Sequence, residues 1–333
     1  MLGLCTAILV AAALHWAEAI LAPIAFALFA IALAWPVQRA VQARTSQAAA
    51  LLVTVLVTLV VLVVLALAIG WGFGRVARWV IANAAPLQLL YMRKLDWLEG
   101  HGMAAALAEQ FDVRQLVQIA QTIVLRLQGV VSFLGLTLVF VILGLLEVEV
   151  AARQLERLAR DRPVAAGLLR AATRTGAKLR AYMLVRTVMS VATGIAVWAF
   201  ARLMGLELAA EWGVIAFVLN YIPFIGSLLA TLFPTIFAVL QFGTWQAAVT
   251  VFLALQAIQF LSGSYVEPRL AGARLALSPF MVLVAVFLGA LLWGIPGAFL
   301  GVPALIAALT LCEEFEGSRW VAGLLSGRVP GEG

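Results

Sequence analysis

The sequence predicts an all-α integral membrane protein with about eight membrane segments, some of them broken or re-entrant. Hydrophobic residues make up 65% of the 333 residues and charged residues only 11%, whereas soluble domains average about 25% charged residues. A membrane-spanning helix needs roughly 20 apolar residues. Apolar runs of about this length, one with an interrupted flank, occur at 47–70, 129–147, 182–204, 227–241, 243–266 and 276–312.

Residues 1–70 are expected to hold the N-terminal membrane helices. As a single helix, the first 34 residues would be about 51 Å long, which is well beyond the thickness of a bilayer. We therefore expect two short helices with a bend near His15, Trp16, Glu18 and Pro23. A cleaved signal peptide is the alternative, but no lysine or arginine precedes the apolar run and the first positive charge is Arg39.

The distribution of positive charge predicts the orientation. Between residues 147 and 186, nine lysines and arginines face four acidic residues, and the positive-inside rule assigns such a segment to the cytoplasm. We expect a basic helical cytoplasmic segment at 148–181, divided into two helices at Pro163. The N-terminus is then cytoplasmic, the segment at 71–128 is extracytoplasmic, and the helix at 129–147 returns. The basic segment could bind a partner, but orientation and contact with anionic lipids explain it more simply.

The extracytoplasmic segment at 71–128 is expected to form amphipathic helices. Leu87, Leu90, Tyr91, Leu95 and Leu98 recur at helical spacing, with charged residues on the opposite face. Asp112 is a suitable N-cap for a second helix, whose apolar stripe is Leu116, Ile119, Ile123 and Leu127. These stripes could pack on the membrane interface, on the protein's own helices or on a neighbouring subunit.

The sequence contains no motif from which a catalytic, nucleotide-binding or metal site can be assembled. Cys5 and Cys312 each lie in an apolar run near one terminus, which is typical of small apolar side chains. His15 and His101 lie beside no second metal ligand. We therefore expect no enzyme activity, no metal and no cofactor. The formal net charge of +6 follows the predicted topology, so we expect no nucleic-acid partner.

Two interrupted apolar elements mark residues 182–316 as a core with broken helices, followed by a flexible cytoplasmic tail at 317–333. Each interruption is an Ile-Pro pair followed by glycine. Backbone groups freed by a break at membrane depth are tolerated where they are buried in protein or line a wet cavity, as in transporters. The residues expected to line a solute or ion pathway are Asn220, Pro223, Gly226 and Ser227 in the first element, and Gly294, Pro296 and Gly297 in the second. Two kinked spanning helices are the alternative.

Polar residues between the two interruptions extend this predicted pathway. Gln256, Gln259, Gly263 and Glu267 fall at i, i+3, i+7 and i+11 on one helical face, and Ser262 adjoins them. Polar side chains within a membrane usually face the bundle interior or a water-filled path. Two interpretations of Glu267 stay open, because it could handle an ion or a proton, or it could end the helix in a pair with Arg269 or Arg274.

Several linked motifs resemble the AI-2E family of bacterial transporters. They are AYMLVRTVMSVATG at 181–194, MGLELAAEWGVIAFVLNYIPFIGSLLATLFP at 204–234 and the stretch from QFLSGSYVEPRLAG to GIPGAFLGVPALIAAL at 259–309, with ALFAIALAWPVQRAV at 27–41. The resemblance implies a multi-pass protein of the bacterial inner membrane, in contact with the lipid bilayer. It also implies a homo-oligomer, with a pentamer as the candidate size. The function it implies is either export of the quorum-sensing signal autoinducer-2 or exchange of sodium or lithium for protons.

One departure from the family pattern affects the choice of substrate. Many relatives carry an acidic residue where this chain has Ser262, within Leu261, Ser262 and Gly263. A hydroxyl stays neutral at physiological pH and cannot replace a coupling carboxylate. This favours export of a small, neutral, polyhydroxylated solute over a cation/proton antiporter. A membrane scaffold or regulatory protein without transport activity is a third interpretation.

The predicted topology is testable by cysteine labelling in a background in which Cys5 and Cys312 are replaced. Thiols introduced at Gln88 and Gln118 should react with an impermeant reagent added to intact spheroplasts, because both positions are predicted to be extracytoplasmic. A thiol at Gln154 should stay unlabelled until the membrane is permeabilised. The reverse pattern would invert the orientation.

Overall fold

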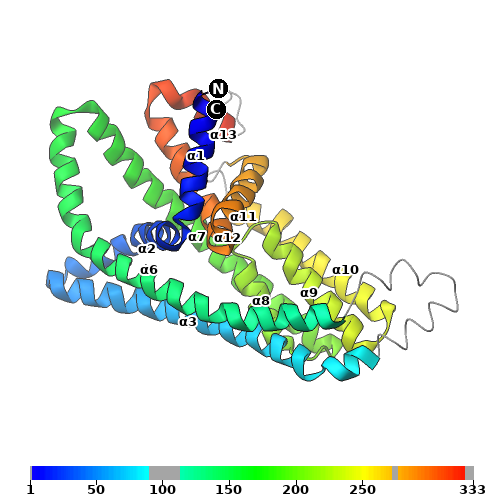
Figure 1. The fold of residues 1–333 in the computed structure, drawn as a ribbon. Helices are drawn as coiled ribbons and strands as arrows, with labels where there is room; N and C mark the ends of the chain where they lie inside the picture. The colour runs from blue at the N-terminus through cyan, green and yellow to red at the C-terminus, as the bar shows by residue number, and fades with distance from the viewer. Residues whose placement is uncertain (1, 90–112, 272–276, 327–333) are drawn as a thin grey trace.

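The computed structural model describes residues 2–89, 113–271 and 277–326 (Figure 1). Within these ranges the chain is helical and contains no β-strand, which confirms the all-α prediction. Seven of the described helices are long and apolar enough to cross a membrane. The principal helices are α1 Leu2–Trp16, α2 Glu18–Gln42, α3 Gln47–Ala82, α6 Val113–Asp161, α7 Pro163–Met204, α8 Ala209–Leu219, α9 Ile225–Phe242, α10 Trp245–Leu261, α11 Glu267–Ala271, α12 Pro279–Glu314 and α13 Arg319–Ser326.

The N-terminal region forms two helices, as the length argument predicted. Helices α1 and α2 meet at Ala17, which leaves the α-helical conformation with ψ of 14°. The bend lies between Trp16 and Glu18, whereas Pro23 is accommodated inside α2. A short turn then leads to α3, where the Ser46 side chain accepts a hydrogen bond from the Ala49 amide at 3.3 Å.

Helices α3 and α6 form a long antiparallel pair that runs side by side across Figure 1. With 36 and 49 residues, they are about 54 Å and 74 Å long, well beyond the roughly 30 Å of a hydrocarbon core. The expected boundaries at 70, 129 and 148 therefore fall inside continuous helices, because a change from apolar to polar residues does not break the backbone. Where these helices leave the bilayer stays a prediction, and Leu90, Tyr91, Leu95, Leu98 and Asp112 lie outside the described residues.

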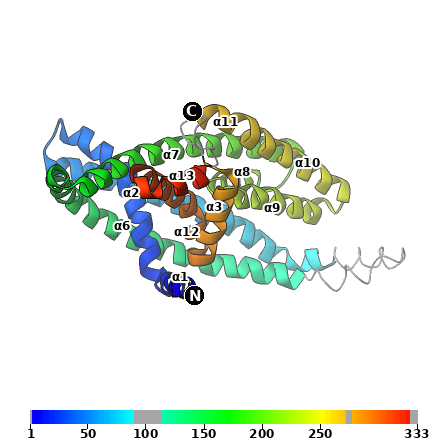
Figure 2. The same ribbon diagram turned by 90° about the horizontal axis from the view of Figure 1, so that it is seen from above.

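The expected break at Pro163 is confirmed. Helix α6 ends at Asp161, Arg162 is extended with ψ of 114°, and Pro163 begins α7. Proline fits this first helical position because its missing amide has no intrahelical partner there. Helix α7 then continues through 182 to Met204 and contacts α6, α8, α10 and α12 (Figure 2).

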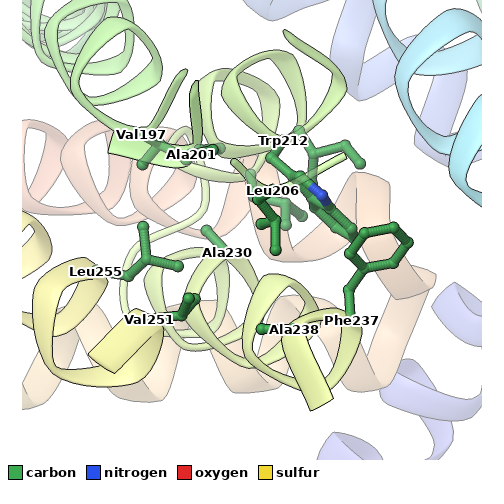
Figure 3. Packing of buried hydrophobic residues seen from close by; sticks show 12 residues of the cluster. Val197, Ala201, Leu206, Trp212, Ala230, Phe237, Ala238, Val251 and Leu255 are labelled. Carbon is green, nitrogen blue, oxygen red and sulfur yellow. The ribbon is translucent and has the colours of Figure 1, made fainter. Parts of the chain in front are cut away.

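Helices α8 and α9 form the first hairpin, with its tip at residues 220–224. The interruption predicted from Pro223 and Gly226 is therefore present. A Cβ on Gly226 would overlap the Leu219 carbonyl, so only glycine lets the two arms approach this closely. The hairpin packs on α7 and α10 through an apolar core that includes Val197, Trp212, Ala230, Phe237 and Leu255 (Figure 3).

Helix α12 forms the second hairpin because its backbone leaves the helical conformation at Trp293 and Gly294. Gly294 has φ of 58° and ψ of −136°, a conformation that strongly favours glycine. The two arms then pack against each other, since a Cβ on Gly297 would overlap the Gly289 carbonyl. The first arm, residues 279–292, is only about 21 Å long. It is shorter than the roughly 30 Å hydrocarbon core, which favours a re-entrant element over one kinked spanning helix.

Ion pairs attach the returning arm of the second hairpin to the basic half of α7. Arg170 and Arg174 contact Glu314 at 2.9 Å and 2.6 Å, and Lys178 contacts Glu313 at 2.8 Å. Spacings of four residues place the three basic side chains on one face of α7. Part of the positive charge interpreted as a topology signal is therefore neutralised within the chain.

The beginning of the C-terminal tail differs from the expected flexible segment. Residues 319–326 form helix α13, in which Ala322 is buried. The amide of Ser278 donates to the Leu325 carbonyl at 3.3 Å, which joins α13 to the start of α12. The amphipathic sequence RWVAGLLS explains the difference, because its apolar face gains burial by packing on the neighbouring helix.

We predict that Gly297→Ala destabilises the second hairpin. The added methyl group would overlap the Gly289 carbonyl, and such overpacking costs about 1 to 3 kcal/mol. Thermal unfolding of the purified protein in detergent measures the loss. Gly135→Ala in α6 is the control, because a Cβ there meets nothing within 4 Å. Equal stability of the two variants would contradict the close packing of the arms.

Candidate functional site

A cavity of about 550 Å³ lies beside the tip of the first hairpin. Its walls come from the middle of α7, the hairpin tip, the end of α10, the turn that follows α10, and parts of α11 and α12. The volume suits a small molecule. The lining residues are Tyr182, Val185, Arg186, Met189, Asn220, Ile222, Pro223, Phe224, Ser227, Gln259, Ser262, Gly263, Ser264, Glu267, Leu277, Pro279, Val282 and Val302.

The hairpin tip is held in position by local hydrogen bonds and by α7. The amide of Ile222 donates to Leu219, and the amide of Gly226 donates to Ile222, at 2.9 Å and 3.0 Å. The side-chain amide of Asn220 donates to the Ser190 hydroxyl of α7 at 3.3 Å. These bonds satisfy groups that the break would otherwise leave unpaired, so the tip can stay open without helical hydrogen bonding.

A π-helical turn at Ser262–Val266 forms another part of the wall. The amide of Glu267 donates to the Ser262 carbonyl, five residues earlier, which is the π-helical register. Pro268 follows and has no amide to continue the α-helical pattern. The wider turn displaces Glu267 from the direction that a regular helix would give it, and single π turns are frequent at functional sites.

An ion pair between α7 and α11 crosses the cavity wall. Arg186 Nη1 lies 3.2 Å from a carboxylate oxygen of Glu267, with side chains 10% and 28% exposed. The Arg186 guanidinium also lies over the Tyr182 ring, 5.9 Å from its centroid. The structure pairs Glu267 with Arg186, 81 residues away in the chain, and not with the adjacent Arg269, which was one of the two partners considered from the sequence. The other, Arg274, lies outside the described residues.

Most residues predicted for the first interruption and the polar stripe meet at this cavity. Those that line it are Asn220, Pro223, Ser227, Gln259, Ser262, Gly263 and Glu267. Gly226 is buried against Leu219 instead and supports the tip. Gln256 is exposed. The buried face of α10 is Ala247, Val251, Leu255 and Gln259, which turns Gln256 away from the core.

The second interruption lies elsewhere. The Trp293 indole donates to the Leu14 carbonyl at 2.9 Å, and His15 Nδ1 lies 2.8 Å from the Leu292 carbonyl. These bonds place the second hairpin tip against the end of α1. The cavity lining does not include Gly294, Pro296 or Gly297. What α12 and the residues just before it contribute to the cavity is Pro279 and apolar side chains.

Sequence reasoning missed Arg186 and Tyr182. Both lie in the apolar run at 182–204, where an arginine within a predicted membrane helix is itself a signal of a functional site. The basic stretch before it hid that signal, since Arg186 was counted with the positive charges that set the orientation.

Comparison with known proteins agrees with this arrangement. The sequence model of a family described as AI-2E family transporter matches residues 4–317. The chain belongs to the AI-2E family of transporters. It is 31% identical over 220 residues to the AI-2 transport protein TqsA of Escherichia coli K12, covering 66% of this chain and 63% of TqsA. It is 29% identical over 244 residues to YhhT of the same organism, covering 71% of this chain and 68% of YhhT. The match thus spans less than two thirds of the length of TqsA.

We predict that Arg186→Gln destabilises this AI-2E family member and that Arg186→Gln/Glu267→Gln recovers most of the loss. Removing one partner of a fully buried pair costs about 3 to 5 kcal/mol. Because 28% of the Glu267 side chain is exposed, we expect about 2 kcal/mol for the single variant. Thermal unfolding in detergent measures both variants.

The exposed Arg269 supplies the control for this pair. Arg269→Gln should leave stability unchanged within about 0.5 kcal/mol, the usual range for surface positions. A greater loss for Arg269→Gln than for Arg186→Gln would restore the adjacent arginine as the relevant partner of Glu267.

Proposed function

We propose that the protein exports a small polar solute related to autoinducer-2 across the bacterial inner membrane, through the cavity at the first hairpin. The observation that carries this proposal is the position of the cavity. It opens at a helix break and is lined by hydrogen-bonding groups from several membrane helices. Such polar groups are costly in an apolar bilayer, which favours a role in binding a solute. Family membership and the printed name of TqsA support the choice of solute.

The lining offers more hydrogen-bonding partners than charges. Asn220, Ser227, Gln259, Ser262 and Ser264 are neutral and can donate or accept hydrogen bonds. Pro279 and several aliphatic side chains supply apolar contacts. This combination suits a compact molecule with several oxygen atoms, which would exchange its hydration for these groups.

A sodium or lithium/proton antiporter is the second candidate, and Glu267 is the carboxylate that it would use. The ion pair with Arg186 weighs against this function. A monovalent cation bound at Glu267 would lie beside the guanidinium, which already neutralises the carboxylate at 3.2 Å. A like charge so close disfavours cation binding.

The proposal includes a homo-oligomer, with a pentamer as the candidate size, and a cytoplasmic N-terminus. Helices α3 and α6 expose many large apolar side chains, among them Leu56, Val60, Val64, Val139 and Leu143. Lipid tails or a second copy of the chain could cover such faces, and the family resemblance favours an assembly. Cross-linking in native membranes would measure the number of subunits.

Flux from proteoliposomes containing the purified protein tests the function. We expect efflux of autoinducer-2 and no change of internal pH when sodium or lithium is added under an imposed pH gradient. A pH response to these cations without solute efflux would establish the antiporter instead. Neither activity, from correctly inserted protein, would favour a scaffold.

We predict that Gln259→Leu weakens solute transport at low solute concentration by about 5- to 150-fold. The substitution keeps approximate volume but leaves polar groups of the solute unpaired, at about 1 to 3 kcal/mol. Gln256→Leu is the matched control, because Gln256 lies on the same helix but is exposed. Equal transport by both variants and the parent protein would place the solute site outside this cavity.

A further inference from the structure

Arg186 uses only part of its guanidinium group to bind Glu267. The carboxylate contacts Nη1, whereas Nε is buried and has no hydrogen-bond partner among the described residues. Nε and Nη2 form the edge of a guanidinium that binds carboxylate or phosphate oxygens through two parallel hydrogen bonds. Glu267 therefore leaves this edge of the Arg186 guanidinium unused.

Two further buried groups at the same cavity have hydrogen-bonding capacity to spare. The Gln259 side-chain nitrogen makes no hydrogen bond within the described part of the chain, and the Tyr182 hydroxyl lies beside the Arg186 guanidinium with no other partner there. Tyr182, Arg186 and Gln259 are each no more than 9% exposed, and all three line the cavity. A buried polar group without a partner is destabilising, because it has lost its hydrogen bonds to water. A ligand that supplies acceptor oxygens would recover part of that loss for each.

We propose that this cavity selects a small polyoxygenated solute that carries one oxyanion group, of the carboxylate type, and binds that group on the Nε–Nη2 edge of Arg186. Tyr182 and Gln259 donate to the same group or to neighbouring oxygens. The neutral side chains Asn220, Ser227 and Ser262 bind the hydroxyl groups of the solute. This inference rests on the proposed function, because it assigns the substrate class of the same cavity.

Glu267 competes with the incoming anion. When it is ionised, two negative groups share one guanidinium, and their repulsion weakens binding. Removal of the Glu267 charge is therefore expected to strengthen binding of the anion. Three residues of the cavity lining have titratable side chains: Tyr182 and Arg186 from α7, and Glu267 from α11. The first hairpin, α10, the π turn and α12 contribute only side chains that do not titrate.

Ribonate and ribitol are suitable probes, since they share a five-carbon polyol chain and differ in one carboxylate group. Their binding to the full-length protein in maltoside detergent is measured by the shift of the unfolding temperature. We expect ribonate to bind at least tenfold more tightly than ribitol.

Variants with opposite effects keep the test independent of folding. Arg186→Lys keeps the charge but loses the two-donor edge, so the preference for ribonate should fall at least tenfold. Glu267→Gln removes the competing anion, so ribonate should bind more tightly, even though the unliganded protein is less stable. Arg269→Gln should leave both probes unchanged.

The outcomes separate this inference from the transport proposal. Equal binding of ribitol and ribonate, or weaker ribonate binding to Glu267→Gln, overturns the oxyanion site while transport of a neutral solute can persist. Arg186-dependent ribonate binding supports the site even where proteoliposomes show no flux, a result that would overturn transport alone. Displacement of ribonate by added phosphatidylglycerol supports the same Arg186 chemistry with a lipid headgroup as the source of the oxyanion.

Discussion

Within a bilayer, each backbone amide and carbonyl must find its partner in the protein, and this constraint shapes both hairpins. A break in a helix frees several such groups at once. In the first hairpin, the short hydrogen bonds at the tip and the bond from Asn220 to Ser190 satisfy groups at the break. In the second, the Leu292 carbonyl contacts His15, and the neighbouring Trp293 indole contacts α1. The breaks persist because the surrounding helices complete their hydrogen bonding.

Close approach of backbones is the second requirement of these hairpins. Gly226 packs on the Leu219 carbonyl, and Gly289 and Gly297 pack on one another. The first hairpin reaches α7 in the same way, since a Cβ on Gly194 or Gly213 would lie within 3.0 Å of the other residue's carbonyl oxygen. Helices in lipid are not driven together by the hydrophobic effect. Small residues favour their association instead, because they let the backbones approach closely and increase van der Waals contact. Helix α7 becomes the common support, contacting both hairpins and contributing Arg186 to the cavity.

Local sequence signals predicted the fold better than they predicted the site. The breaks at Pro163, Pro223 and Gly294 follow from the conformations that proline and glycine allow, and these depend on few neighbours. The pairing of Glu267 with Arg186 depends on how α11 and α7 pack, which no local pattern encodes. Helical spacing grouped Gln256 with Gln259, but burial follows the Val251, Leu255 and Gln259 series instead. The π turn at Ser262–Val266 changes the phase of the helix and adds to the error.

The short first arm of the second hairpin has a consequence for biosynthesis. Its 279–292 segment is too short to cross the bilayer as an independent helix, so it depends on contacts with segments synthesised earlier. Helix α1 holds the tip, and Arg170, Arg174 and Lys178 of α7 hold the returning end. Those partners precede the hairpin in the chain and are synthesised before it. The second hairpin is therefore expected to dock after α1 and α7 are in place, and a ribosome that stalled within α12 would leave these two helices without the element that contacts both.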